Sequence, residues 1–405
     1  MAERPLTFLC VSCYFKGADF LTACKELGNK VFLVTAKKLE HKPWPREHID
    51  EIFYVEEDED QAWNMDQVID GLAYFMRANK VDRMVALDDF DVEKVTHLRE
   101  HFRMPGMGQT TGRHFRDKLA MRVKAQESGI AVPAFCGLFN DAEINEFADT
   151  VPAPWLVKPR GEASATGITK VHNKEELWNV IHGLGDKRHN YLVERFAPGD
   201  VYHIDSISHN GKIVFTRVSK YLDTPMEVAH GGGIFRSHMV EFGGEDDKAL
   251  QKLNTQVMKA FGMRDSASHS EFIKSKETGE FFFLETASRV GGAHIVEMVE
   301  AGSGVNLWKE WARLETMVTK GESYKAPKST KDYAGIVVSL SRFQHPDMSG
   351  FNDEEIWWKM NEEYHVGMVL KSNSRTRILE LLDDYAQRIF NDFHASAPVP
   401  DKPMH

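Results

Sequence analysis

The stretch EFFFLETASRVGG, residues 280–292, begins as an apolar strand and ends in polar residues. The run from Phe281 to Leu284 is typical of a strand packed inside a sheet. Glu285 ends this run, Arg289 follows four residues later, and two glycines come next. Packing alone does not account for a carboxylate and a guanidinium at the end of a buried strand, so these residues need another role.

The same strand is the second half of a predicted β-hairpin, HSEFIKSKETGEFFFLE. Residues 277–279 form its loop, with glycine at the third position, where φ is typically positive. If Lys276 faces Glu280, then Glu271 lies opposite Glu285, at about 5 Å between Cβ atoms. Two carboxylates at that distance repel unless a divalent cation such as Mg²⁺ or Mn²⁺ lies between them. The alternative is a surface hairpin on which both glutamates face solvent.

Composition excludes several classes of function. The chain has 405 residues and a net charge of −11, which argues against a protein that binds nucleic-acid backbones. It contains no run of about 18 apolar residues, so we expect no membrane span. We interpret the N-terminus as mature protein. Cys10 and Cys13 form a C-x-x-C without a second metal-binding half, which favours reduced thiols and a cytoplasmic location.

The N-terminal third has the pattern of a parallel sheet. Residues 6–13 and 30–36 predict strands and residues 17–28 a helix between them, which is a β-α-β unit. A further strand is expected over 81–89. The first turn contains Lys16 and Gly17 but no G-x-G-x-x-G, which argues against a dinucleotide site.

The remaining chain predicts mixed elements. Residues 110–129 read as one amphipathic helix with a Thr cap and a Gly stop. Residues 189–215 predict antiparallel strands with Asn210–Gly211 as the turn. A helix is expected near 245–261. The tail predicts strands at 333–340 and 365–372 and a helix over 374–393.

The stretch KPRGEASATG, residues 158–167, predicts a phosphate-binding loop after a strand that ends at Lys158. Gly161, Ser164 and Gly167 belong to a run of small residues that lets backbone N–H groups approach phosphate oxygens. The pattern is not the G-x-x-x-x-G-K-[ST] loop. Two alternatives stay open: a hairpin loop without a ligand, and a solvated surface position for Lys118.

These motifs occur in a fixed order: RDKLAMR, LVKPRGEASATGITKV, YLVERFAPGDVYHIDSISHNG and the hairpin 269–292. In that order they resemble the ATP-grasp superfamily, within it the carboxylate–amine ligases related to biotin carboxylase and L-amino acid ligases. The resemblance covers residues 80–310 most strongly. It implies a multidomain α/β and α+β chain. The resemblance also implies an N-terminal Rossmann-like domain over 1–109, an ATP-grasp domain over 110–320 with lobes 110–192 and 193–320, and a C-terminal α+β portion over 321–405.

The resemblance also implies roles for single residues. Lys118, Lys158 and the loop 161–167 would hold the ATP phosphates, and Glu194 with the backbone of Arg195–Ala197 would meet the adenine. Glu271 and Glu285 match the metal-binding pair, and Arg289 matches the arginine that binds the carboxylate and acyl phosphate. Arg236, in the Gly-rich stretch 229–236, and Gly291 are further candidates for the substrate site.

Three departures from the family pattern matter. Ala287 stands where an Asn metal ligand is common, and Val201 where a Glu often holds the ribose, for which Asp200 or His203 could substitute. The N-terminal sequence usual in biotin carboxylase is absent, and that enzyme's bicarbonate and biotin residues have no match.

The resemblance therefore implies an Mg²⁺- or Mn²⁺-dependent ligase that joins a small carboxylate to an amine, amino acids among the candidates. ATP phosphorylates the carboxylate, the amine displaces phosphate from the acyl phosphate, and ADP is released. A homodimer is compatible with this function. Two alternatives remain: a biotin-dependent carboxylase subunit that activates bicarbonate, and an ATP-binding protein that performs no ligation.

Overall fold

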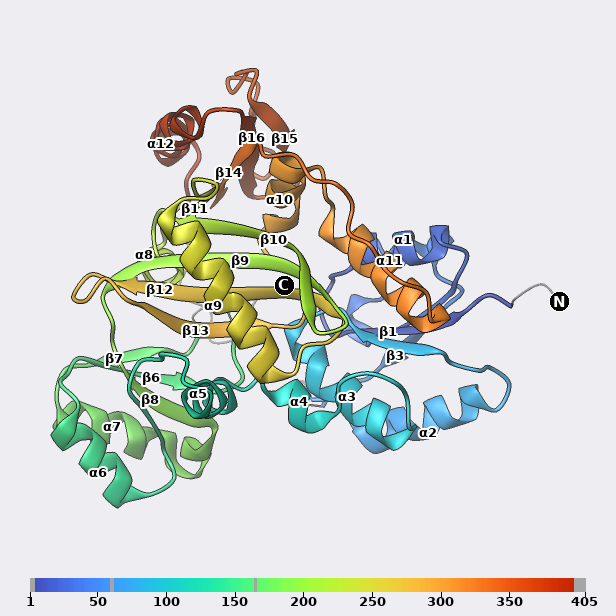
Figure 1. Ribbon diagram of the computed structural model, residues 1–405, viewed down its shortest axis with the longest axis horizontal. Coiled ribbons are helices and arrows are strands. Elements are labelled where there is room, and N and C mark those ends of the chain that lie inside the picture. The colour runs from blue at the N-terminus through green and yellow to red at the C-terminus, as the bar shows by residue number, and fades with distance from the viewer. Residues whose placement is uncertain (1–3, 59–61, 164–165, 397–405) are drawn as a thin grey trace.

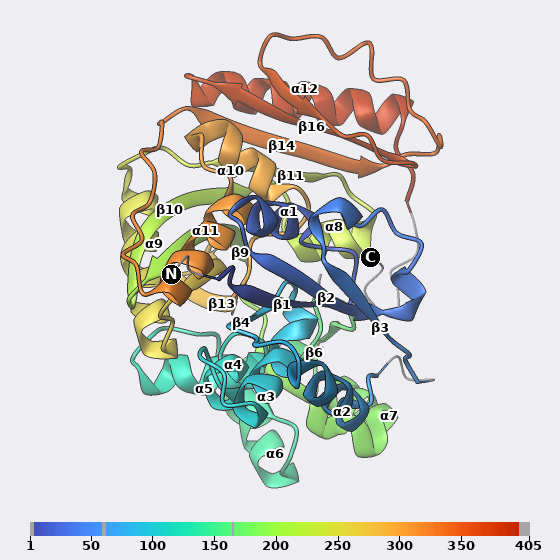
Figure 2. The ribbon, with the colours of Figure 1, turned by 90° about the vertical axis from the view of Figure 1, so that its right-hand side faces the viewer.

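The computed structural model describes residues 4–58, 62–163 and 166–396. These residues form two four-stranded sheets and one eight-stranded sheet. The N-terminal sheet, a smaller lobe and the large sheet occupy three regions of the molecule (Figures 1 and 2). The α/β and α+β architecture expected from the sequence is confirmed.

The N-terminal sheet is parallel, in the order β3-β2-β1-β4. Its elements are β1 (Thr7–Ser12), α1 (Ala18–Glu26), β2 (Lys30–Ala36), β3 (Glu51–Val55), α2 (Met65–Met76), β4 (Arg83–Ala86) and α3 (Val92–His101), with short 3₁₀ turns η1 (Lys37–Leu39), η2 (Arg46–His48) and η3 (Asp89–Asp91). The predicted β-α-β unit is confirmed, since β1 and β2 pair in parallel with α1 between them. Strand β1 is buried along its whole length, as expected for a continuous apolar run in a parallel sheet.

The smaller lobe contains an antiparallel sheet in the order β5-β8-β6-β7. Its elements are β5 (Phe135–Gly137), α6 (Asp141–Thr150), β6 (Trp155–Pro159), β7 (Thr169–Val171), α7 (Lys174–Leu184), the turn η4 (Gly185–Asn190) and β8 (Tyr191–Arg195). Helices α6 and α7 lie together on the outer side of this sheet (Figure 1). The sheet therefore presents its other side to the rest of the molecule.

The large sheet is antiparallel and runs β13-β12-β9-β10-β11-β14-β16-β15. Its strands are β9 (Gly199–His209), β10 (Lys212–Tyr221), β11 (Phe235–Met239), β12 (Ser266–Ser275), β13 (Phe281–Ala287), β14 (Tyr333–Leu340), β15 (Ile356–Lys359) and β16 (His365–Ser372). Its helices are α8 (Pro225–Gly231), α9 (Glu245–Phe261), α10 (Ile295–Ser303), α11 (Leu307–Lys320) and α12 (Arg375–Asp392). Helix α9 crosses one face (Figure 1), and the C-terminal strands β14–β16 extend the same sheet.

The single helix predicted over 110–129 is wrong. The structure has two helices, α4 (Gln109–Arg113) and α5 (Lys118–Glu127). Asp117 separates them because its carboxylate accepts the backbone N–H groups of Leu119 and Ala120, which caps a new helix. Arg160 fixes that carboxylate from the neighbouring loop, with Nε 3.0 Å from Oδ1. The break places Lys118 at the first position of α5.

The hairpin of β12 and β13 pairs Glu271 with Glu285, as expected, but the predicted turn pairing is wrong. The backbone of Ser275, not Lys276, bonds to Glu280. A one-residue bulge between Glu271 and Phe272 then shifts the register back. The two differences cancel, so the carboxylates face each other across the strands.

Among the described residues, every helix is too short or too polar to cross a bilayer. The largest buried cluster joins the N-terminal sheet to α10 and α11, with Phe20 and Trp311 packed edge to face at 5.0 Å between ring centroids. The N-terminal sheet is thereby packed firmly against the large one.

Candidate active site

A cleft of about 1250 Å³ lies where the three sheets meet. Residues predicted from the sequence that line it are Lys118, Lys158, Glu194, Arg195, Ala197, Glu271, Glu285 and Arg289. Other predicted residues are described by the structure but do not belong to its lining: Gly161, Gly167, Asp200, His203, Arg236 and Gly291. Ser164 lies outside the described residues.

The two hairpin carboxylates face this cleft. The Tyr221 hydroxyl donates to Glu271 Oε1 at 2.8 Å, and Lys118 Nζ lies 2.7 Å from Glu285 Oε2. Burial raises the pKa of Glu285, but the charges of Lys118 and Lys158 outweigh it and hold the pKa at about 2. Two carboxylates side by side offer hard oxygen ligands that fit a divalent cation such as Mg²⁺ or Mn²⁺.

Lys158, at the end of β6, lies in a buried charge network. Its Nζ donates to the carboxylate of Glu194, which also accepts from Arg122 Nε at 3.0 Å. Burial lowers the pKa of Lys158 to about 8, although Glu194 opposes that shift. The Glu194 carboxylate thus forms ion pairs with both Lys158 and Arg122.

Arg122 is a residue that the sequence motifs did not single out. Its side chain is fully buried, and its Nη1 donates to the carbonyl of Leu284, at the bulge of β13. Because Arg122 also pairs with Glu194, it ties β8 to β13. The signal available in the sequence is its spacing of four residues from Lys118, which places both side chains on one face of α5.

The segment after β8 forms one end of the cleft. The backbone N–H groups of Arg195 and Phe196 donate to the carbonyls of Ala134 and Pro154, at 2.8 and 3.0 Å. Ala197 is the next residue along and lines the cleft. The Arg195 side chain turns outward to Glu277, at 2.7 Å. Apolar residues on neighbouring strands complete this end: Val201, Ile273 and Leu284.

Neither candidate for the ribose reaches the cleft lining. Asp200 points to the opposite face of β9 from Val201 and pairs with Lys220 at 2.7 Å. His203 shares the face of Val201 but is fully buried, with Tyr221 packed on its ring at 4.7 Å between centroids. The alternation of the strand and the cover from Tyr221 explain both positions.

The structure describes residues 158–163 and 166–167 of the predicted phosphate-binding loop. Gly167 has φ 71°, a left-handed conformation that favours glycine, and its neighbour Thr166 lines the cleft. Lys118 Nζ donates to the carbonyl of Glu162 at 2.6 Å, which draws the loop toward α5. Gly161 lies near Arg116, since a Cβ added there would be 3.7 Å from Arg116 Nη2. The phosphate-binding role of the loop stays a prediction.

Arg289 reaches the N-terminal sheet. Strand β13 continues to Ala287 and the next helix begins at Ile295, so Arg289 lies in the loop between them. Arg289 Nη2 donates to Asp89, in the turn after β4, and this partner raises the pKa of Arg289 despite burial. Arg289 Nε and Asp89 Oδ1 are buried without a hydrogen-bond partner among the described residues.

The remaining substrate candidates have structural contacts. Arg236 bridges Asp223 and Asp383, each at 2.8 Å. A Cβ at Gly291 would lie 2.9 Å from Asp205 Oδ1, so glycine is needed there for close packing. In the Gly-rich stretch 229–236, residues up to Gly231 belong to α8 and β11 begins at Phe235. Residues 224–229 line the cleft.

Comparisons with known proteins were made at the level of family, sequence and structure. No family model matches. The L-arginine-specific L-amino acid ligase of Bacillus subtilis is 26% identical over 243 residues, which cover 58% of this chain and 57% of that protein. The chain thus spans under two thirds of the length of that relative.

Solved structures match almost the whole chain. L-amino acid ligase from Bacillus licheniformis superimposes with a TM-score of 0.75 at 15% identity, over 97% of this chain and 99% of that one. The biotin carboxylase domain of 2-oxoglutarate carboxylase from Hydrogenobacter thermophilus, solved with MgADP and bicarbonate, gives 0.71 at 16% identity, over 97% and 91%. The chain therefore has the ATP-grasp fold, and part of it is similar in sequence to an L-amino acid ligase.

Proposed function

We propose that this protein is an ATP-dependent ligase that joins a small carboxylate to an amine through an acyl phosphate, releasing ADP and phosphate. The observation that carries the proposal is the meeting of Lys118 and Lys158 with Glu271 and Glu285 in one cleft. These groups come from both lobes, as a site that surrounds a triphosphate requires. The relationship to an L-amino acid ligase favours ligation over bicarbonate activation and makes amino acids the first substrates to test.

The nucleotide would lie between the smaller lobe and the large sheet. Adenine would occupy the apolar end beside Ala197 and Val201, with Ala197 presenting its backbone to the base edge. Lys158 and Lys118 would bind the phosphates, exchanging part of their contacts with Glu194 and Glu285 for phosphate oxygens. Glu271 and Glu285 would hold Mg²⁺ or Mn²⁺, which supplies positive charge to the β- and γ-phosphates.

Arg289 would position the substrate carboxylate for attack on the γ-phosphorus. A guanidinium fork matches a carboxylate and then an acyl phosphate. The carboxylate oxygen forms the new bond to phosphorus while the bond to the β-phosphate oxygen breaks, leaving ADP. The amine then attacks the acyl carbon and phosphate departs. Orientation and charge do most of this work, without a covalent protein intermediate.

The domain division is part of the same proposal. Residues 1–109 would form the N-terminal domain, 110–320 the ATP-grasp domain and 321–405 a C-terminal portion. Strand β8 continues past the expected lobe boundary at 192, and β14–β16 share the large sheet, so we propose that the C-terminal portion moves with the larger lobe.

The proposal is tested by following oxygen atoms. The protein is incubated with ATP, Mg²⁺ and single amino acids or simple carboxylates labelled with ¹⁸O in the carboxylate, with an amine pool. We expect ADP, an amide product and ¹⁸O in the released phosphate, because one carboxylate oxygen leaves with the phosphoryl group. AMP with pyrophosphate, or phosphate without label, would overturn the acyl-phosphate mechanism.

A further inference from the structure

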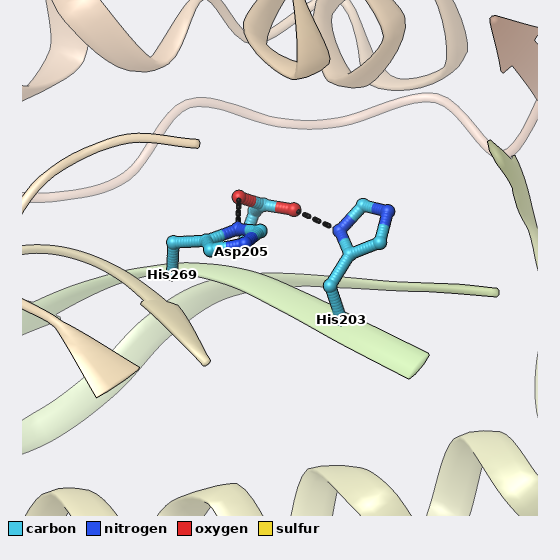
Figure 3. A group of neighbouring side chains, drawn as sticks. All are labelled: His203, Asp205 and His269. Carbon is cyan, nitrogen blue, oxygen red and sulfur yellow. Dashed lines mark hydrogen bonds and ion pairs between the residues drawn. The ribbon is translucent and has the colours of Figure 1, made fainter. Parts of the chain in front are cut away.

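A buried polar cluster lies beside Glu271, one of the two carboxylates proposed to hold the metal. His203 and Asp205 project from β9 and His269 from β12 (Figure 3). Asp205 lies between the two rings: His203 Nδ1 is 2.8 Å from Oδ2, and His269 Nδ1 is 2.9 Å from Oδ1. All three side chains are buried.

The two histidines differ in what their other ring nitrogen meets. His203 Nε2 is hydrogen-bonded to the Ser237 hydroxyl at 2.7 Å, so both its nitrogens are occupied. His269 Nε2 faces Glu271 Oε1 at 3.7 Å, beyond hydrogen-bonding distance, and His269 lines the cleft. Of the pair, His269 alone presents a ring nitrogen to the proposed metal site.

The position of His269 in the sheet suits a metal ligand. It is two residues before Glu271 on the same face of β12, and its partner across the strands is Ala287, which has no ligand atom. Two metal–ligand bonds of about 2.1 Å span at most about 4.2 Å, so a separation of 3.7 Å allows one cation to contact both side chains.

Asp205 has the arrangement of a supporting carboxylate. A histidine that binds a metal commonly donates its other ring N–H to a carboxylate, which fixes the tautomer and the ring orientation. The bond from His269 Nδ1 to Asp205 does this and directs Nε2 at Glu271. Gly291 lets the chain pass close to Asp205 Oδ1. By contrast, an ion among the three members of the cluster would have to displace both Nδ1 hydrogen bonds.

We propose that His269 Nε2 is a ligand of the divalent cation held by Glu271 and Glu285, with Asp205 as its positioning residue. Asp205 holds the proton on Nδ1, so Nε2 coordinates through its lone pair. An imidazole ligand favours Mn²⁺ over Mg²⁺ relative to an all-oxygen site. This inference rests on the proposed function, because it assumes that the carboxylate pair binds the cation of the nucleotide.

The direct test is the magnetic coupling between Mn²⁺ and histidine nitrogen. The full chain is prepared with natural and with ¹⁵N-labelled histidine, and pulsed electron paramagnetic resonance is recorded on its complex with Mn²⁺ and ADP. We expect a nitrogen coupling that changes with the isotope. We expect it to disappear in His269→Asn and to remain in His203→Asn, a matched change at the other end of the cluster.

Two further measurements separate positioning from general damage. Asp205→Asn should weaken Mn²⁺ binding by about 10- to 100-fold, as loss of an outer partner typically does, while the nitrogen coupling weakens. Adding Ala287→Asn to His269→Ala should restore Mg²⁺ binding, because an amide oxygen then faces the same site. Both variants are first checked for native thermal unfolding.

Absence of histidine coupling in the wild-type Mn²⁺–ADP complex would overturn the inference, whether or not the variants fold. Coupling that survives in His269→Asn would overturn it as well. ADP formation is measured on the same wild-type sample. A sample that makes ADP but has no coupling refutes the histidine ligand alone, whereas a sample that neither binds Mn²⁺–ADP nor makes ADP refutes the proposed function.

Discussion

Lys118 Nζ lies 2.7 Å from Glu285 Oε2, so the proposed phosphate lysine and the proposed metal ligand form an ion pair across the cleft. The pair joins α5 to β13 of the large sheet. A nucleotide phosphate and its cation would insert between these two side chains. The phosphate would bind the Lys118 ammonium, and the cation would bind the Glu285 carboxylate. Binding of nucleotide and metal is therefore expected to be mutually dependent.

Glu285→Gln should abolish turnover while the protein stays folded. The amide cannot supply the negative charge that the cation and Lys118 require. Loss of several kcal/mol of charge stabilisation corresponds to about 100-fold or more in kcat/KM, at about 1.4 kcal/mol per factor of ten. The control is Glu280→Gln, an exposed position on the same hairpin. Turnover within about threefold of wild type at limiting Mg²⁺ would contradict the metal assignment.

ATP affinity should fall at alkaline pH because of Lys158. Burial holds the pKa of this ammonium at about 8, and the charged form is the one that binds phosphate. Below that pH the free protein is charged and affinity is constant. Above it, affinity should drop about tenfold per pH unit as the proton is lost.

Titration calorimetry of ATP binding between pH 7 and 9.5 measures the pH above which affinity begins to fall. Lys158→Arg should remove it, because a guanidinium stays charged throughout the range. A flat affinity across the range in the wild-type protein would show that Lys158 does not contact the nucleotide.

Arg289→Lys should lose most activity and keep ATP binding. An ammonium cannot form the two parallel hydrogen bonds of the guanidinium fork, so we expect about a 100-fold loss in kcat, similar to removal of one oxyanion donor. Arg236→Lys is the matched control, because Arg236 bridges Asp223 and Asp383 away from the cleft lining. Equal losses in the two variants would argue against a role for Arg289 at the reacting carboxylate.

Arg122→Met should destabilise the fold. The change removes one of the two cations on the buried Glu194 carboxylate and leaves the Leu284 carbonyl without its donor. Breaking a buried ion pair from one side typically costs about 3–5 kcal/mol. Chemical denaturation against Lys124→Met, on the same helix but partly exposed, measures the difference. A loss below about 1 kcal/mol would show that Lys158 alone satisfies Glu194.

Local patterns in the sequence determined much of the architecture. The apolar run of β1, the helix after it and the strand at Lys30–Ala36 are set by short-range periodicity and by their turns, and they were predicted closely. The pairing of Glu271 with Glu285 was also predicted, because a tight hairpin confines the register to within one residue. The strand that ends at Lys158 was evident from its apolar residues.

Tertiary structure alone decided which charges meet. Arg289 and Asp89 are 200 residues apart in the chain, and no local pattern relates them. The same holds for Arg122 with Leu284 and for Asp205 with His269, whose partners lie on different strands or lobes. The local sequence pattern indicates which secondary structure a segment forms and which of its faces is buried. The partner of a buried polar group depends on packing between distant segments, which also placed His203 under Tyr221 and Arg236 against α12.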